Sequence, residues 1–200
     1  MKRRALLGTL VALAAAGAIT AGASAVMAAW RPEPAPLAFQ ATDVTGVPWG
    51  RDFRLTGHDG RPYQLADFRG KVVAVYFGFT HCPDVCPLTM ATLGQVVHLL
   101  GDDGGRVQIV FITVDPRHDK PDVLARYVRA FHEDFLGLYG DRQEVARAAA
   151  EFKVEAGEHH STPVFLLDPG GRLRLVVRAE TTAESIAGDI RLLLKTSGRT

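Results

Sequence analysis

The sequence predicts an α/β fold with a central mixed sheet flanked by helices and an added hairpin on the N-terminal side. Two apolar runs, residues 72–79 and 107–114, have the length of buried strands and alternate with segments of helical periodicity. Two later apolar runs flank the turn sequence Asp-Pro-Gly-Gly, which indicates a second hairpin near the C-terminus. The chain has 200 residues and 47% apolar side chains, which is enough for one packed domain.

The first predicted elements precede the central strands. Residues 53–56 and 63–65 flank the turn sequence His58-Asp59-Gly60, so they form the N-terminal hairpin. The buried strand 72–79 follows, and a helix begins near Cys86 and ends at a glycine-rich turn. Apolar residues recur along this helix at three- and four-residue steps: Met90, Leu93, Val97 and Leu100.

The remaining predicted elements follow the second buried strand. Asp119 and Pro121 begin a helix, and its apolar face carries Val123, Leu124, Tyr127, Val128 and Phe131. Residues 141–144 form a capping box for the next helix. Residues 163–167 and 173–177 pair as the second hairpin, and residues 181–184 cap a last helix that runs to about Lys195.

Residues 1–30 are predicted to be a targeting segment. Lys2, Arg3 and Arg4 are followed by an uncharged stretch, residues 5–30, as in an export signal. The stretch is also long enough to anchor the chain in a membrane, which the sequence slightly favours over a cleaved signal. Either way the remainder is exported to the periplasmic side of the inner membrane. Residues 31–50 are a proline-rich linker, and residues 51–200 are the folded domain.

Cys82 and Cys86 are the only cysteines and lie where a buried strand gives way to a helix. A helix N-terminus stabilises a thiolate, and this order of elements is typical of a thioredoxin-like fold. A structural disulfide is disfavoured, because so small a ring removes little entropy from the unfolded chain. The pair therefore predicts either a redox couple or a site for a soft metal.

Three residues separate the cysteines, one more than in the usual dithiol oxidoreductase, which leaves room for a metal between the sulfurs. A third ligand must come from seven histidines. His159 and His160, just before the predicted strand 164–167, are the better placed candidates, whereas His81 and His118 are weaker ones. The net charge of +1 and the lack of a basic run in the exported part argue against nucleic acid as a partner.

Residues 77–87, with the sequence FGFTHCPDVCP, resemble the signature of the Sco/SenC family. The resemblance continues in residues 114–121 and in a histidine eight residues before Asp168, and it covers roughly residues 38–196. It implies a thioredoxin-like domain, usually tethered to a membrane, that binds copper as Cu(I) or Cu(II). The ligands implied for this chain are Cys82, Cys86 and His160.

The same resemblance implies a role in building the copper centre of cytochrome c oxidase, by copper delivery, by thiol reduction, or by both. The partners would be a copper-accepting oxidase subunit and other copper carriers. The family often has an aspartate before the ligand histidine, and His159 stands there instead, so the role of His159 stays open. Two alternatives remain: a thiol–disulfide oxidoreductase that uses Cys82 and Cys86 without metal, and a copper-responsive redox sensor.

Overall fold

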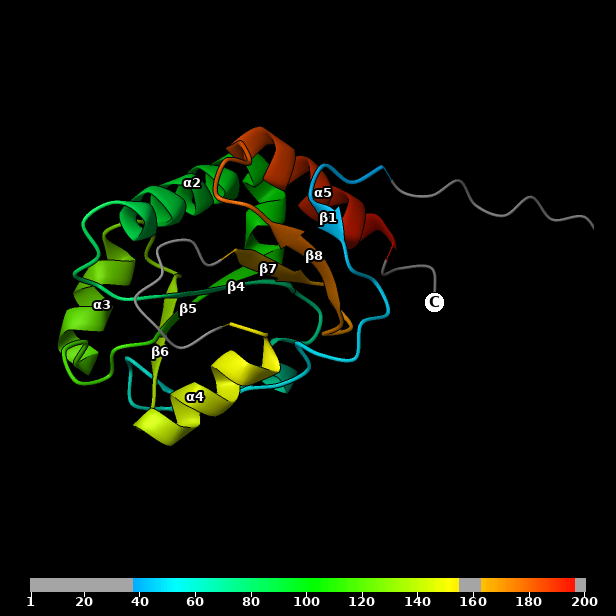
Figure 1. Cartoon of the computed structure of the whole chain (residues 1–200). Coiled ribbons are helices and arrows are strands. Elements are labelled where there is room, and N and C mark those ends of the chain that lie inside the picture. The colour runs from blue at the N-terminus through cyan, green and yellow to red at the C-terminus, as the bar shows by residue number, and fades with distance from the viewer. Residues whose placement is uncertain (1–37, 155–162, 197–200) are drawn as a thin grey trace, which may run out of the picture. The chain divides into compact units, whose positions relative to one another are not determined.

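The computed structural model of this protein describes residues 38–154 and 163–196 (Figure 1). In this part of the chain eight strands form one mixed sheet in the order β1-β8-β7-β4-β5-β6-β2-β3. The strands are β1 (Thr42–Asp43), β2 (Arg54–Gly57), β3 (Pro62–Gln64), β4 (Val72–Gly78), β5 (Val107–Thr113), β6 (Leu136–Tyr139), β7 (Val164–Leu167) and β8 (Leu173–Val177). The helices are η1 (Leu65–Phe68), α2 (Val85–Leu100), η2 (Gly101–Arg106), α3 (Pro121–Arg129), α4 (Arg142–Glu151) and α5 (Ala183–Thr196).

The centre of the sheet consists of β4 with its two neighbours, parallel β5 and antiparallel β7. Every residue of β4 is buried, because helices cover both faces of the sheet. Alternate β4 side chains point to opposite faces. Val72, Ala74 and Tyr76 pack with α2, α3 and α5, while Val73, Val75 and Phe77 pack with α4, η1 and β2. Figure 1 shows α2 and α5 on one side of the sheet and α4 on the other.

The predicted α/β class is confirmed, and so are both hairpins. β2 pairs with β3, and the hairpin joins the sheet through an antiparallel contact between Thr56 and Tyr139. β7 pairs with β8 around the predicted turn. The predicted capping box of α4 is also present: the Glu144 amide donates to the Asp141 carboxylate, and the Asp141 amide donates to Glu144, both at 2.8 Å.

Two strands, β1 and β6, were not predicted from the sequence. β6 is a four-residue run between helices, too short to show a strand periodicity. β1 has polar residues and forms only by pairing with β8. The predicted linker, residues 31–50, therefore overlaps the folded unit, which begins at Ala38.

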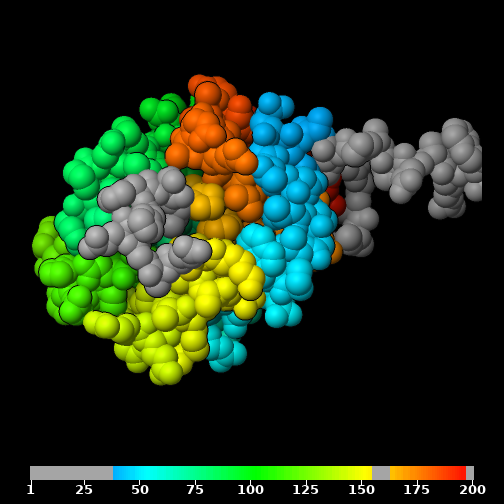
Figure 2. Space-filling model, in the orientation of Figure 1, coloured from blue at the N-terminus to red at the C-terminus, as the bar shows by residue number. Residues whose placement is uncertain are grey.

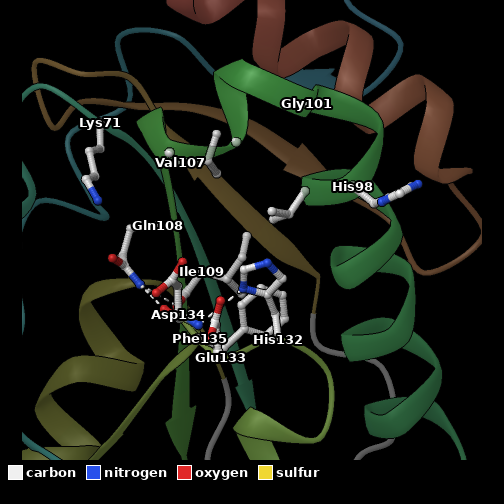
Figure 3. Close-up of a pocket in the computed structure, with 13 residues that line it drawn as sticks. Lys71, His98, Gly101, Val107, Gln108, Ile109, His132, Glu133, Asp134 and Phe135 are labelled. Carbon is white, nitrogen blue, oxygen red and sulfur yellow. Dashed lines mark hydrogen bonds between the residues drawn. The ribbon is translucent and has the colours of Figure 1, made fainter.

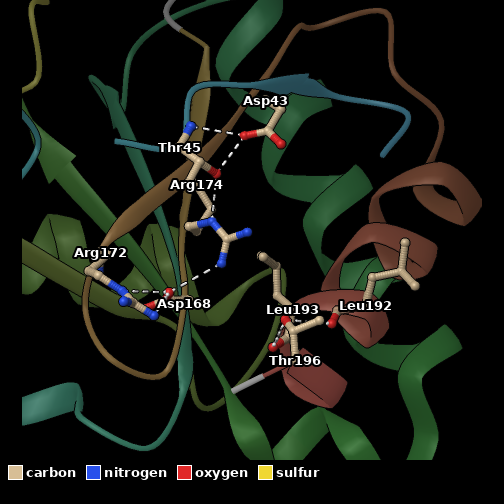
Figure 4. Close-up of polar contacts among 8 residues, drawn as sticks. All are labelled: Asp43, Thr45, Asp168, Arg172, Arg174, Leu192, Leu193 and Thr196. Carbon is tan, nitrogen blue, oxygen red and sulfur yellow. Dashed lines mark hydrogen bonds and ion pairs between the residues drawn. The ribbon is translucent and has the colours of Figure 1, made fainter. Parts of the chain in front are cut away.

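Buried carboxylates explain why residues 38–50 pack on the domain. Asp189 of α5 accepts hydrogen bonds from the backbone amides of Gln40 (2.9 Å) and Ala41 (2.8 Å). Arg174 of β8 donates to the Thr45 hydroxyl at 2.7 Å and also reaches buried Asp168 (Figure 4). Residues 38–50 consequently share a continuous surface with the C-terminal hairpin (Figure 2).

The predicted targeting segment, residues 1–30, lies outside the described residues. Within residues 38–154 and 163–196, none of the helices combines the length and the apolar character that a membrane span requires. The targeting segment and the part of the linker before Ala38 thus stay predictions from the sequence.

Candidate thiol and metal site

The two cysteines lie at the junction that the sequence predicts. β4 ends at Gly78, a short loop carries Cys82, and α2 begins at Val85 with Cys86 in its first turn. Both side chains are buried, and both are free thiols in this structure. Their sulfurs are within hydrogen-bonding reach of each other. The fold thus brings the two predicted ligands together at one point.

The first turn of α2 favours a thiolate on Cys82. Burial by itself raises the pKa of this thiol, but hydrogen bonds from the backbone amides of Asp84, Cys86 and Val85 outweigh it. The Cys86 side chain adds a further hydrogen bond, and the resulting pKa lies below that of an ordinary cysteine. These amides are the unpaired donors that every helix N-terminus presents.

Cys86 behaves in the opposite way. Burial is the largest effect and raises the pKa of this thiol above the ordinary value, and the hydrogen bond and charge of Cys82 raise it further. A hydrogen bond from the Tyr76 side chain and one from the Phe79 backbone lower it, but they do not compensate. One cysteine of the pair is therefore prepared as a thiolate while the other keeps its proton.

This asymmetry predicts that iodoacetamide modifies Cys82 faster than Cys86 in the folded, reduced protein at pH 7, because only the thiolate reacts. The ratio of the two rates should fall as the pH rises and Cys86 also ionises. Peptide mass spectrometry after short labelling times would measure it. In urea-unfolded protein the two residues should react at similar rates, and equal rates in the folded state would contradict the assignment.

Gly78, at the end of β4, makes room for Cys86. A Cβ atom at this position would lie 3.0 Å from the Cys86 Sγ and 3.0 Å from the Phe111 Cε2. Phe111 continues an aromatic layer beneath the sulfurs, with ring centroids 6.0 Å from Tyr76 and 5.3 Å from Tyr127. The pair thus rests on a tightly packed apolar floor.

Asp119 ties the cysteine loop to the end of β5. Its buried carboxylate accepts hydrogen bonds from the Thr80 amide (3.0 Å), the Thr80 hydroxyl (2.6 Å) and the Thr113 hydroxyl (2.6 Å). The sequence alone did not indicate this residue as part of the site. The signal that could have found it is an aspartate soon after a buried strand parallel to the one that leads to the cysteines.

His81 and His118 lie together on the rim of the site around Asp115. The His118 Nδ1 is 2.6 Å from the Asp115 Oδ2, and the two imidazole rings are 5.5 Å apart. Although burial by itself raises the pKa of Asp115, the hydrogen bond and charge of His118 outweigh it and hold this pKa below its usual range. The His81 Nε2 is 3.8 Å from the same carboxylate.

The predicted third ligand, His160, lies outside the described residues, as does His159. Within residues 38–154 and 163–196, no group of three or more histidine, cysteine, aspartate or glutamate side chains is arranged to hold a metal. After residues 155–162 the described chain continues into β7, whose Val164 pairs with Tyr76 of β4. His160 therefore stays a prediction from the sequence.

A separate cavity of about 630 Å³ opens at the opposite end of the central strands. Its lining includes Lys71, His98, Val107 and His132, from the start of β4 and β5 and from the ends of helices (Figure 3). Gly78 and Cys86 lie at the other end of β4, so this cavity and the thiol site are distinct places in the fold.

A thioredoxin-like α/β domain with a cysteine pair at a strand-to-helix junction is the class of protein that the fold and the site define. A sequence profile of the family SCO1/SenC matches residues 42–195 of this chain. The chain therefore belongs to the SCO1/SenC family, as its cysteine motif suggested.

Individual relatives agree with this assignment. The mitochondrial SCO2 homolog of Homo sapiens is 42% identical over 153 residues, which cover 70% of this chain and 58% of that protein. Among solved structures, copper-bound ScoI of Bradyrhizobium japonicum has a TM-score of 0.65 at 30% identity and covers 72% of this chain and 99% of its own. Apo Sco1 of Thermus thermophilus has a TM-score of 0.69 at 35% identity and covers 80% and 99%. The chain spans under two thirds of the length of the human relative.

Proposed function

We propose that this chain is an exported copper-binding protein that serves the assembly of the copper centre of cytochrome c oxidase. The observation that carries the proposal is the pair of buried thiols, Cys82 and Cys86, held within hydrogen-bonding reach at a helix N-terminus. Relatives of the same fold that have been solved with copper bound support it. Copper is here the cargo that the protein receives and passes on.

The two thiols suit a soft ion such as Cu(I), which prefers thiolate ligands. Cys82, whose pKa is lowered, gives up its proton more readily as the ion binds than Cys86, whose pKa is raised. His160 is the proposed third ligand, and an added imidazole would make the site acceptable to Cu(II) as well. The position of Val164 beside Tyr76 supports a ligand that lies shortly before β7.

The asymmetry of the two thiols favours a second candidate function, reduction of a disulfide in the target protein. The Cys82 thiolate would attack one sulfur of that disulfide, form a mixed disulfide and release the other sulfur as a thiolate. Cys86, once deprotonated, would then displace the target sulfur and close the Cys82–Cys86 disulfide. The target gains two electrons and its two thiols, and the pair is oxidised.

The proposed place of action is the periplasmic side of the inner membrane, with residues 1–30 as anchor or export signal. The uncharged stretch after Lys2, Arg3 and Arg4 supports this placement. The proposed partners are a copper-accepting subunit of the oxidase and other copper carriers. Fractionation of cells that express the full chain, with antibody detection of the membrane and soluble fractions, would test the placement.

Copper titration of the purified protein tests the proposed function. Cu(I) is offered in competition with bicinchoninate, and Cu(II) is followed by its sulfur-to-copper charge-transfer absorption. We expect one equivalent of bound copper, loss of stoichiometric binding in the double variant Cys82→Ser plus Cys86→Ser, and weaker binding in His160→Ala. His98→Ala, at the far end of α2, is the matched histidine control and should bind as the unaltered protein does.

Two results would contradict the copper proposal: copper bound stoichiometrically by the double serine variant, or no copper bound by the unaltered protein. A parallel assay without metal decides the second candidate. Turnover of a disulfide substrate in the presence of a chelator, lost in Cys82→Ser, would favour the reductase. Binding of copper without any such turnover would exclude it.

A further inference from the structure

A cavity with three basic side chains borders the rim of the thiol site. It has a volume of about 350 Å³ and lies between the loop after β5 and the start of α4. The loop contributes Arg117 and Lys120, and α4 contributes its first residue, Arg142. Asp115 lines the same cavity and also bonds His118 on the rim of the thiol site. This basic cavity shares no lining residue with the larger cavity of Figure 3.

The positive charge of the basic cavity is available to a ligand. Arg117, Lys120 and Arg142 are all exposed. Among the residues that the structure describes, none of these three side chains has a hydrogen-bond or ion-pair partner. The two carboxylates in the lining, Asp115 and Asp141, already form hydrogen bonds within the protein at 2.6 and 2.8 Å. The three cations therefore point to an anionic partner from outside the described chain.

Another cavity beside α4 shows how the same fold neutralises basic side chains. This balanced cavity, of about 600 Å³, is also lined by three arginines, but three carboxylates line it as well. Two of the arginines form ion pairs there: Arg51 with Glu151 at 3.4 Å, and Arg54 with Asp52 at 3.6 Å. The third arginine is Arg147. An unmatched group of cations is thus a property of the basic cavity and not of every hollow on this surface.

The loop that carries Arg117 and Lys120 is held in a fixed position. Within the loop, the Asp119 amide donates to the Asp115 carbonyl at 3.0 Å. The buried Asp119 carboxylate also binds Thr80 of the cysteine loop, through its amide at 3.0 Å and its hydroxyl at 2.6 Å. Because the loop backbone is already ordered, a ligand pays little to bind there. A ligand in the basic cavity is consequently held at a defined place relative to the thiols.

We propose that the basic cavity is a docking site for an acidic segment of the partner protein. Its carboxylates would accept hydrogen bonds from Arg117, Lys120 and Arg142, which are charge-assisted and stronger than neutral ones. Exposed charges of this kind raise the rate of encounter and fix its orientation. The partner would thus arrive with one face turned to the cysteine pair. The inference deepens the proposed function, on which it rests for the identity of the partner.

Binding of an acetylated hexaglutamate peptide tests the inference without any metal. Amide chemical shifts of the reduced, metal-free protein, labelled with nitrogen-15, report where the peptide binds. We expect saturable shifts in residues 114–120 and 140–142, and weaker binding at raised salt, because salt screens exposed charges. An uncharged hexaserine peptide should cause no such shifts. Shifts that are absent from these residues, or equal shifts with hexaserine, would overturn the inference.

Two triple variants decide whether the position of the charges matters. Changing the three cations of the basic cavity to glutamine should weaken hexaglutamate binding about tenfold, as for the loss of three exposed ion pairs. The matched control changes the three arginines of the balanced cavity and removes the same net charge, so its affinity should stay unchanged. The six substitutions are Arg117→Gln, Lys120→Gln and Arg142→Gln for the test, and Arg51→Gln, Arg54→Gln and Arg147→Gln for the control.

An equal loss of affinity in both triple variants would show that the peptide responds to net charge alone, against the inference. All six side chains are exposed, so both proteins should keep the urea midpoint of the unaltered protein. The single variants Arg117→Gln and Arg142→Gln serve if the triple variant is less stable, and each should bind about twofold more weakly. Inorganic phosphate that binds the cavity as tightly as hexaglutamate would contradict a docking segment and indicate a small-anion site.

Copper titration of the same proteins separates this inference from the proposed function. The basic-cavity variant should bind one equivalent of Cu(I) as the unaltered protein does, because none of its three residues belongs to the copper site. Copper binding without a response to hexaglutamate contradicts the docking site and leaves the copper proposal standing. A response to hexaglutamate at residues 114–120 and 140–142, in a protein that binds no copper, supports the docking site and contradicts the copper proposal.

Discussion

Asp119→Ala is expected to lower the free energy of unfolding by about 3–5 kcal/mol and to release the loop that carries Cys82. The carboxylate is fully buried and accepts three hydrogen bonds, two from Thr80 and one from Thr113. Alanine would leave the buried Thr113 hydroxyl and the two half-buried donors of Thr80 without this acceptor. Because Thr80 stands two residues before Cys82, the loss should also weaken copper binding.

Urea denaturation of the reduced protein measures the first effect, and competition for Cu(I) measures the second. Asp119→Asn keeps one acceptor oxygen and should fall between the unaltered protein and the alanine variant. Asp122→Ala is the matched control, because Asp122 is exposed and pairs with exposed Arg126. Loss of this pair should cost less than about 0.5 kcal/mol. Equal midpoints for Asp119→Ala and Asp122→Ala would show that the buried carboxylate does not hold the loop.

Asp119 also illustrates what the sequence could and could not predict. The elements with a strong local pattern, such as β4, α2 and the box that caps α4, were predicted from residue periodicity and capping signals. From the sequence, Asp119 was predicted to begin a helix. Its contact with the cysteine loop was not predicted, because its partner Thr80 lies 39 residues away. β1 was missed for the same reason, since it forms by pairing with β8, which is distant in the sequence. β6 was missed because its four residues are too few to show a strand period.

The candidate site was likewise predicted from the sequence only in part. The spacing of Cys82 and Cys86 and their place at a helix start were sufficient to predict the pair. That position alone predicts a lowered pKa for both thiols, but the structure gives opposite directions. The difference arises because Cys86 lies within the helix and against Gly78 and Phe111, where burial dominates. Such burial depends on the packing of α2 on the sheet, which the sequence does not display.

Gly78→Val is expected to be the most damaging single change on the strand side of the site. Even a lone Cβ would lie 3.0 Å from both the Cys86 sulfur and the Phe111 ring, and valine adds two more methyl groups. Gly78 cannot move away easily, because its carbonyl accepts from the Val114 amide at 2.8 Å and β4 is buried between β5 and β7. The sulfur and the ring must therefore shift.

Overpacking of this kind costs about 1–3 kcal/mol of unfolding free energy. Displacement of one sulfur should also weaken Cu(I) binding by more than the stability loss alone explains, because the ligand geometry changes. Gly188→Ala in α5 is the control: nothing lies within 4 Å of its added Cβ, so the change should stabilise the helix slightly. Gly78→Ala should fall between Gly188→Ala and Gly78→Val in both urea midpoint and Cu(I) affinity. If all three variants bind Cu(I) equally, the space beside Gly78 does not set the position of Cys86.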